Sequence, residues 1–176
     1  MSKEIKKEIM SWIKTFTISV IMAMLILQVI QPTIVKEVSM LPTLEPNNYL
    51  VLEKISSRMG KLERGDIIVF KTEMTTEDGK EKNLIKRIVG LPGDHIVIYA
   101  GKVVVNEELL QEEYLSGAET EGSVDLIVDE GKIFVMGDNR KVSLDSRSPK
   151  VGLIDMESII GRAMVRLYPF DEIRNF

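Results

Sequence analysis

The longest uncharged stretch of the chain runs from Thr15 to Val35, 21 residues between Lys14 and Lys36. A helix of this length measures about 30 Å, which is close to the thickness of the hydrocarbon core of a bilayer. Its central part is apolar on all sides rather than in one stripe, as a lipid-facing helix requires. Pro32 predicts that the helix breaks near the interface. We therefore predict a transmembrane anchor over residues 15–35.

Two alternatives for this segment are a cleaved signal peptide and a buried soluble helix. The sequence Ile30-Gln31-Pro32-Thr33-Ile34-Val35 has no small-residue cleavage site, which argues against the first. The all-round apolar character argues against the second. Four lysines precede the span and only Lys36 follows it closely, which favours a cytoplasmic N-terminus over residues 1–14. The prediction is a single-pass protein of the cell membrane whose residues 36–176 lie outside the cytoplasm.

After Lys36, short apolar runs rich in Val and Ile recur between turn residues, as in antiparallel β-sheets. Ala100-Gly101 separates two of these runs by two residues, which predicts a tight hairpin. We expect a mainly β domain, with a smaller inserted β region over about residues 95–135. The predicted strands are Tyr49–Lys54, Asp66–Phe70, Leu84–Val89, His95–Tyr99, Lys102–Val105, Asp125–Val128, Lys132–Met136 and Gly161–Leu167. Thr72–Asn83 is expected to be a solvated hairpin loop and Glu107–Glu121 a surface excursion.

Composition excludes several classes of function. The 176 residues carry a net charge of −4 and contain no long basic run outside the N-terminus, so nucleic acid is not an expected partner. No cysteine is present, and His95 is the single histidine, so neither a disulfide nor a thiolate or multi-histidine metal site can form. None of the motifs requires a cofactor or a metal.

Two segments carry candidate chemistry. Ser39, in Ser39-Met40-Leu41-Pro42-Thr43, follows the predicted span by four residues, and Lys86 comes 47 residues later. A serine hydroxyl needs a base to become a nucleophile, and lysine is a base only when neutral. Its pKa, near 10.4, must then fall by about two or more units, which desolvation among apolar neighbours achieves. Strand alternation predicts an inward Lys86 and an outward Arg87. Taken alone, each residue also fits a plainer interpretation, Ser39 opening a turn and Lys86 lying on the surface.

A third segment, Gly137–Arg147, follows an apolar strand and is dense in Asp, Asn, Arg and Ser. This density indicates a hydrogen-bonded scaffold beside a site, although an exposed loop with scattered ion pairs is the alternative.

Together these segments resemble the bacterial type I signal peptidases, in the compact Gram-positive form. The motifs are Ser-Met-x-Pro-Thr, Arg64-Gly65-Asp66 with its strand, Lys-Arg-x-x-Gly-x-Pro-Gly-Asp and Gly-Asp-Asn-Arg-x-x-Ser-x-Asp-Ser-Arg, in the same order and spacing. The resemblance extends from the span to Tyr168-Pro169-Phe170. It implies a signal-peptidase-type β domain that removes signal peptides from exported preproteins after Ala-x-Ala sites.

The resemblance also implies roles for individual residues. Ser39 is the nucleophile and Lys86 the general base, and the Ser39 N–H donates to the oxyanion. Ser143 hydrogen-bonds the lysine amine, and Asp145 and Arg147 form an ion pair that holds the loop. Gly137 and Asp138 shape that loop. The expected pocket residues, whose alternative role is core packing, are Val35, Met40, Leu44, Leu84 and Ile85. The substrate is expected to pair as a strand with an exposed edge near Asn83–Ile85.

Glu37 departs from the family pattern, which has Ser, Thr or Gly two residues before the nucleophile. A carboxylate would repel the oxyanion, so either Glu37 turns away or a water or backbone group supplies the second donor. The partners expected are signal peptides and the lipid bilayer, and a monomer is expected. The alternative function is a weakly active or inactive accessory protein for surface or pilus assembly. Adhesion through Arg64-Gly65-Asp66 is disfavoured because a buried strand follows, and soluble self-cleaving Ser/Lys repressors lack a span.

Overall fold

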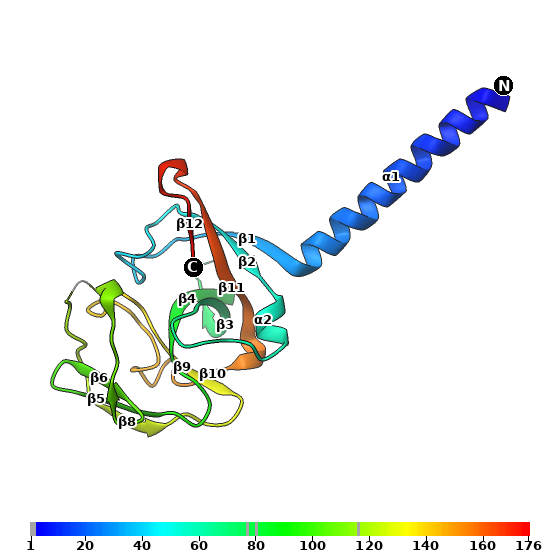
Figure 1. Ribbon diagram of the computed structural model, residues 1–176. Helices are drawn as coiled ribbons and strands as arrows, with labels where there is room; N and C mark the ends of the chain where they lie inside the picture. The colour runs from blue at the N-terminus through cyan, green and yellow to red at the C-terminus, as the bar shows by residue number, and fades with distance from the viewer. Residues whose placement is uncertain (1–2, 77, 80, 116) are drawn as a thin grey trace.

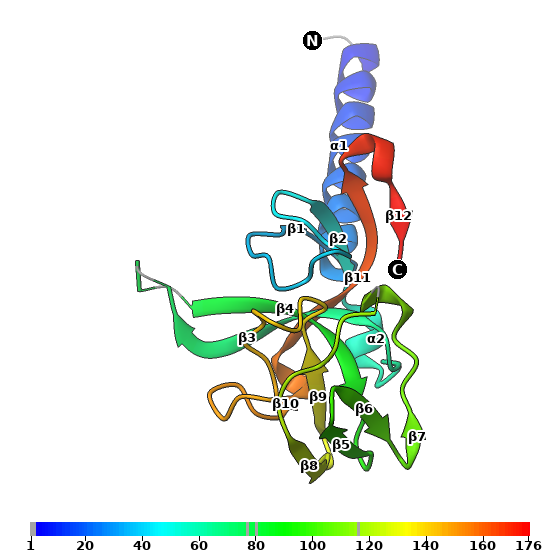
Figure 2. The same ribbon diagram turned by 90° about the vertical axis from the view of Figure 1, so that its left-hand side faces the viewer.

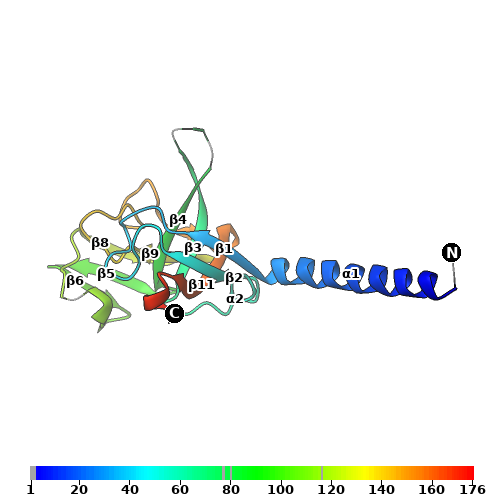
Figure 3. The same ribbon diagram turned by 90° about the horizontal axis from the view of Figure 1, so that it is seen from above.

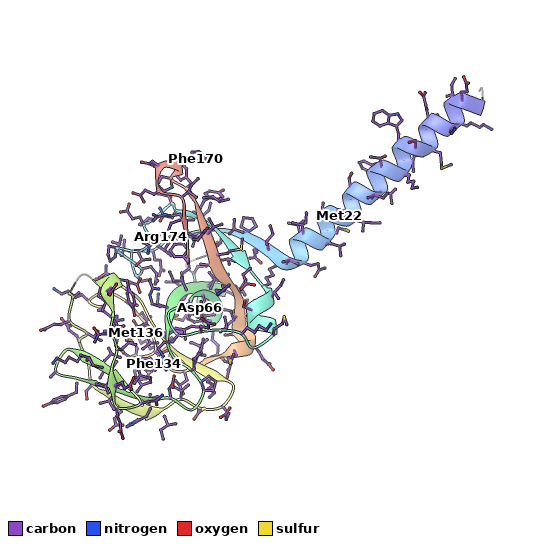
Figure 4. The ribbon with its side chains drawn as sticks, viewed as in Figure 1. Met22, Asp66, Phe134, Met136, Phe170 and Arg174 are labelled. Carbon is purple, nitrogen blue, oxygen red and sulfur yellow. The ribbon has the colours of Figure 1, made fainter. Side chains whose placement is uncertain are left out.

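The computed structural model describes residues 3–76, 78–79, 81–115 and 117–176. A long helix, α1 (Lys3–Val29), projects from a β domain and continues directly into the first strand, β1 (Ile30–Ile34) (Figure 1). The side chains of α1, such as Met22, extend away from the domain (Figure 4). By length and composition α1 could cross a membrane, with a mean hydropathy of 1.8 in its most apolar window and none of that window buried.

The predicted anchor, residues 15–35, is not helical to its end. The described helix, Lys3–Val29, ends six residues before the predicted bound. Residues Ile30–Ile34 form β1 instead, paired antiparallel with β2 (Tyr49–Glu53). β1 is an edge strand, where a proline that cannot donate a hydrogen bond is tolerated, so Pro32 fits within it.

The larger sheet is antiparallel and has the strand order β1-β2-β11-β3-β4-β9-β10, with β12 paired to β11. This confirms the predicted mainly β, antiparallel fold. The remaining strands of this sheet are β3 (Ile67–Thr75), β4 (Glu81–Gly90), β9 (Lys132–Met136), β10 (Ile154–Asp155), β11 (Ile159–Tyr168) and β12 (Arg174–Asn175). The region predicted as a loop, 72–83, largely extends β3 and β4 into a long hairpin that projects from the domain (Figure 3).

The smaller sheet has the order β7-β6-β5-β8 and lies at the end of the domain away from α1 (Figure 2). Its strands are β5 (His95–Tyr99), β6 (Lys102–Val105), β7 (Glu108–Leu109) and β8 (Val124–Ile127). Ala100 and Gly101 both have positive φ, 50° and 80°, as the tight hairpin between β5 and β6 requires. The inserted region was predicted to reach about residue 135, but β9 pairs with β4 in the larger sheet. Short helical turns complete the fold: α2 (Ile55–Arg58), η1 (Glu113–Leu115), η2 (Met156–Ser158) and η3 (Phe170–Glu172).

The core has three parts. One is formed by residues of β2, β3 and β11 together with Met40 and Leu44, and a second lies among β3, β4 and β9. The third joins the two sheets: Phe134 and Met136 of β9 pack with Ile96 of β5 (Figure 4). β9 belongs to the larger sheet and contacts the smaller one through these side chains, and its end leads into the loop that carries the third motif.

Candidate active site

The nucleophile candidate Ser39 lies in a turn that follows β1. The backbone of Val35 exchanges two hydrogen bonds with the next turn, accepting from Asn47 N at 2.8 Å and donating to Asn48 O at 3.0 Å. Met40, the residue after the serine, is buried in the first part of the core. These contacts fix the serine from both sides and leave its side chain close to the surface of a cavity.

The amine of Lys86 lies against that serine. Lys86 Nζ is 2.7 Å from Ser39 Oγ and donates to the main-chain oxygen of Ile85 at 2.9 Å. Lys86 comes from β4 and its relative exposure is 1%. The two residues that the sequence places 47 positions apart are therefore in direct hydrogen-bond contact.

Burial lowers the pKa of Lys86 from 10.5 to about 8, against the opposing negative charges of Glu37, Asp145 and Asp138. At pH 7 a group with a pKa of about 8 is neutral in about one molecule in ten, compared with about one in 3000 for an ordinary lysine. The site thus supplies a neutral amine beside a serine hydroxyl, which is what proton abstraction needs.

The loop from Gly137 to Arg147 holds the nucleophile turn in place. Asn139 donates from its backbone N–H to Ser39 O at 3.0 Å and from its side chain to Val38 O at 3.1 Å. Gly137 packs so closely here that an added Cβ would lie 2.4 Å from Ser39 O and 2.3 Å from Ser143 Oγ. Only glycine fits at this position without displacing the loop.

Asp145 and Arg147 form the ion pair that the resemblance implied, with Arg147 Nε 2.9 Å from Asp145 Oδ1. Asp145 also accepts the Gly137 N–H at 3.0 Å, and Arg147 donates to Arg140 O at 2.8 Å. Burial alone would raise the pKa of Asp145, but Arg147 and the Gly137 N–H hold it below its ordinary value of 3.8. The carboxylate therefore stays ionised and closes the loop on itself.

Ser143 differs from its expected role in this structure. Its Oγ is buried and makes no hydrogen bond of ordinary geometry, whereas the resemblance implied a bond to the Lys86 amine; it lies near the Asp145 carboxylate and helps to lower the pKa of that group. The amine instead uses Ser39 and Ile85, and the Ser143 hydroxyl lies against Gly137.

Arg87 was predicted to point outward, and this was wrong. Although it lies on the face opposite Lys86, it is only 8% exposed, because Tyr114 covers its guanidinium at 3.9 Å from the ring centre. It forms two hydrogen bonds with Asp138, at 2.9 and 2.6 Å, and one with Gly65 O at 2.8 Å. Asp138 thereby attaches the loop to the strand that carries the base.

The acidic segment predicted as a surface excursion, Glu107–Glu121, contributes to the same network. Glu112 forms a bidentate ion pair with the buried Arg140, which also donates to Thr120 and, at 3.1 Å, to Gly137 O. Arg87 and Arg140 each belong to one of the sequence motifs, but nothing in the spacing of those motifs indicated that their partners come from the region of the smaller sheet, between β7 and β8.

A cavity of about 520 Å³ opens beside the serine. Three of the five predicted pocket residues, Val35, Met40 and Ile85, line it. Leu44 and Leu84 do not, because both are buried in separate parts of the core. For these two residues the alternative role, core packing, is what the structure shows.

Two backbone edges frame this cavity as a groove. β1 pairs with β2 on one side only, and the chain after it, through Glu37, lines the groove. β4 pairs with β3 along most of its length, but within the described residues β9 covers its other edge only between Arg87 and Gly90. The edge at Asn83 and Ile85 is therefore open toward the cavity.

Glu37 turns away from the nucleophile. Its carboxylate Oε1 lies 2.5 Å from Lys82 Nζ on β4. Of the two alternatives left open by the sequence, the structure has the one in which the carboxylate is directed elsewhere. Among the described residues, no group of three acidic or histidine side chains could hold a metal ion.

Comparisons with known proteins show the family to which the chain belongs. Residues 9–168 match the family model described as signal peptidase, peptidase S26. A signal peptidase I from Bacillus licheniformis is 36% identical over 96% of this chain and 94% of its own. Signal peptidase I S of Bacillus subtilis is 33% identical over the same shares. A crystal structure of a signal peptidase I from Enterococcus faecalis is similar with a TM-score of 0.48 and 28% identity, covering 58% of this chain and 96% of that one. The chain belongs to the signal peptidase family, peptidase S26, a family of serine endopeptidases that remove signal peptides.

Proposed function

We propose that this protein is a membrane-anchored endopeptidase that cuts signal peptides from exported preproteins with a Ser39–Lys86 dyad. The observation that carries the proposal is the 2.7 Å contact between Lys86 Nζ and Ser39 Oγ at a buried lysine whose pKa is lowered to about 8. The family supports the reaction class, and the geometry supports the assignment of the two residues.

The reaction follows from that contact. Neutral Lys86 takes the proton of Ser39 as Oγ attacks the scissile carbonyl carbon, and the backbone N–H of Ser39 donates to the oxyanion. When the tetrahedral intermediate collapses, the lysine ammonium gives its proton to the leaving amine, and the signal peptide stays attached to Ser39 as an ester. Lys86 then deprotonates a water that attacks the ester carbonyl, and the returning proton regenerates the serine.

The substrate binds as an extended strand in the groove. Its backbone pairs with the open edge of β4 at Asn83–Ile85, a mode in which main-chain hydrogen bonds give affinity and side-chain pockets give specificity. Val35, Met40 and Ile85 line the cavity beside Ser39 with apolar surface, which favours small residues of the Ala-x-Ala type before the cut.

α1 anchors the enzyme, with its lysine-rich N-terminus in the cytoplasm and the β domain outside. Because α1 continues directly into β1, Ser39 lies only ten residues beyond the last helical residue, Val29. This short separation supports a site close to the membrane surface, where the end of a translocated signal peptide emerges.

The test is cleavage of a purified preprotein by the full-length protein in detergent, with Ser39→Ala and Lys86→Ala alongside. Cutting after an Ala-x-Ala site that disappears in both variants supports the dyad and the substrate class together. Cutting that survives Ser39→Ala contradicts the assignment. No cutting by the wild type at alkaline pH would favour an accessory role in surface or pilus assembly.

A further inference from the structure

Glu37 and Lys82 lie on opposite walls of the groove and are joined by an ion pair of 2.5 Å. Glu37 precedes the nucleophile by two residues on the wall that follows β1, and Lys82 precedes the base by four residues on β4. Both side chains line the cavity, and they are 46% and 32% exposed, so the pair lies at the mouth of the groove.

We propose that the Glu37–Lys82 ion pair is a strap across the groove that a substrate must displace before its backbone can pair with β4. The proposal rests on the proposed function, because it assigns the strap to the groove in which the preprotein is expected to bind. It concerns two residues that take no part in the proton transfers described above.

The geometry of strand addition gives the reason. A strand that adds to the edge of β4 lies about 4.8 Å from it, between β4 and the opposite wall. Glu37 and Lys82 are in contact at 2.5 Å, so where they meet there is no space between the two walls for the backbone of a third chain. Entry of the substrate therefore has to separate Glu37 from Lys82.

The cost of opening is small, because a partly exposed ion pair is weak. Removing the strap should lower KM by about two- to fivefold, and kcat should change little at a pH where Lys86 is already neutral. An ordinary structural contact beside a substrate groove would have the opposite effect, since its loss raises KM.

The pair also gives a second signature through its charges. The charged groups that act on Lys86 are Glu37, Asp138 and Asp145, which raise its pKa, and Lys82, which lowers it. Neutralising Glu37 should therefore shift the pH–rate profile to lower pH, and neutralising Lys82 should shift it to higher pH. Both substitutions nevertheless lower KM, which separates the strap from a purely electrostatic effect on the base.

The experiment measures kcat and KM on one purified preprotein at about pH 10 for the wild type, Glu37→Gln, Lys82→Gln and the double neutral variant. A charge-swap variant, Glu37→Lys with Lys82→Glu, can re-form the pair with reversed polarity. Lys132→Gln is the matched control, because it breaks a 3.4 Å ion pair with Asp129 that lies on the small-sheet side of the molecule. We expect lower KM in the three neutral variants, a return toward the wild-type value in the swap and no change in the control.

Salt provides a further check, since about 1 M salt screens exposed charges. It should lower the KM of the wild type toward that of the double neutral variant. An unchanged or higher KM in the neutral variants, or no return in the swap, overturns the strap while leaving the peptidase assignment intact. Failure of the wild type to cut, or cutting by Ser39→Ala, refutes the peptidase assignment instead, so the two failures are distinguishable.

Discussion

Replacing Lys86 by methionine should stabilise the β domain while abolishing cleavage. The amine is buried, and its pKa falls from 10.5 to about 8 because burial disfavours the charged form. At about 1.36 kcal/mol per pKa unit, holding this lysine in the folded state costs about 3 kcal/mol at pH 7. Methionine has a similar length and no charge. It removes that cost but loses the hydrogen bonds to Ser39 and Ile85, so the net gain at pH 7 is about 1–3 kcal/mol.

The dependence on pH has a definite sign. Between pH 8 and 10.5 the unfolded chain keeps the proton on Lys86 while the folded protein has lost it, so the stability of the wild type rises with pH. The advantage of the methionine variant should therefore shrink by about 2–3 kcal/mol between pH 7 and pH 10. The part of the hydrogen-bond loss that does not depend on protonation is the same at both pH values and cancels from this difference, and the part that does is contained in the pKa of Lys86.

The assay is urea unfolding in detergent, followed by circular dichroism of the strands, for both proteins at pH 7 and pH 10. Trp12, the single tryptophan, lies in α1, so tryptophan fluorescence would not report on the β domain. A stability difference that stays constant between the two pH values would refute the argument that desolvation sets the basicity of Lys86.

Three further results are expected. The kcat/KM of the wild type should rise tenfold per pH unit below about pH 8 and level off above it, as Lys86 loses its proton; a flat profile between pH 6 and 10 would exclude it as the base. Gly137→Ala should reduce kcat by about 100-fold or more, because the new Cβ meets Ser39 O at 2.4 Å and Ser143 Oγ at 2.3 Å; wild-type kcat would show that the loop can yield. Asp145→Asn should lower the stability at pH 7, since the folded pKa of Asp145 is depressed; the loss should begin to shrink as the pH falls below the unfolded value of 3.8 and should disappear only below the depressed folded pKa, so thermal unfolding should show a smaller loss at pH 3 than at pH 7.

Most strands after Lys36 were predictable because they are short runs rich in Val and Ile between turn residues, a local signal that needs no knowledge of the partners. The contact between Ser39 and Lys86 was predictable only through the family resemblance of four motifs, because each of the two residues taken alone also fits a plainer interpretation. The end of the helix was not predictable, because the sequence of residues 30–34 is compatible with either a helix or a strand. The strand is formed because β2 supplies its hydrogen-bond partners.

Contacts between distant segments were also beyond the sequence. Nothing in the spacing of Arg87 indicates that Tyr114 covers it, or that Glu112 reaches the loop through Arg140. Leu84 was expected to line the pocket because it lies two residues from Lys86 in the sequence. It packs in the core instead, so position in the sequence was not sufficient to predict its role. The partner of Glu37 is Lys82, which lies in the hairpin of β3 and β4. Because residues 72–83 are polar, the sequence predicted a loop there and gave no indication that the two strands extend so far.

The direct passage of α1 into β1 has a mechanical consequence. β1 pairs with β2 over five residues, so the helix and the larger sheet are joined without a flexible linker. The part of α1 without formal charges, residues 15–29, is about 22 Å long, which is shorter than a hydrocarbon layer of about 30 Å, so the bilayer thins around it or the chain beyond Val29 is drawn toward the interface. Since no linker separates α1 from β1, a thicker bilayer draws the β domain closer to its surface. In a membrane, bilayer thickness would then set the distance between the groove and the interface, so lipid composition would select among substrates without touching a residue of the site.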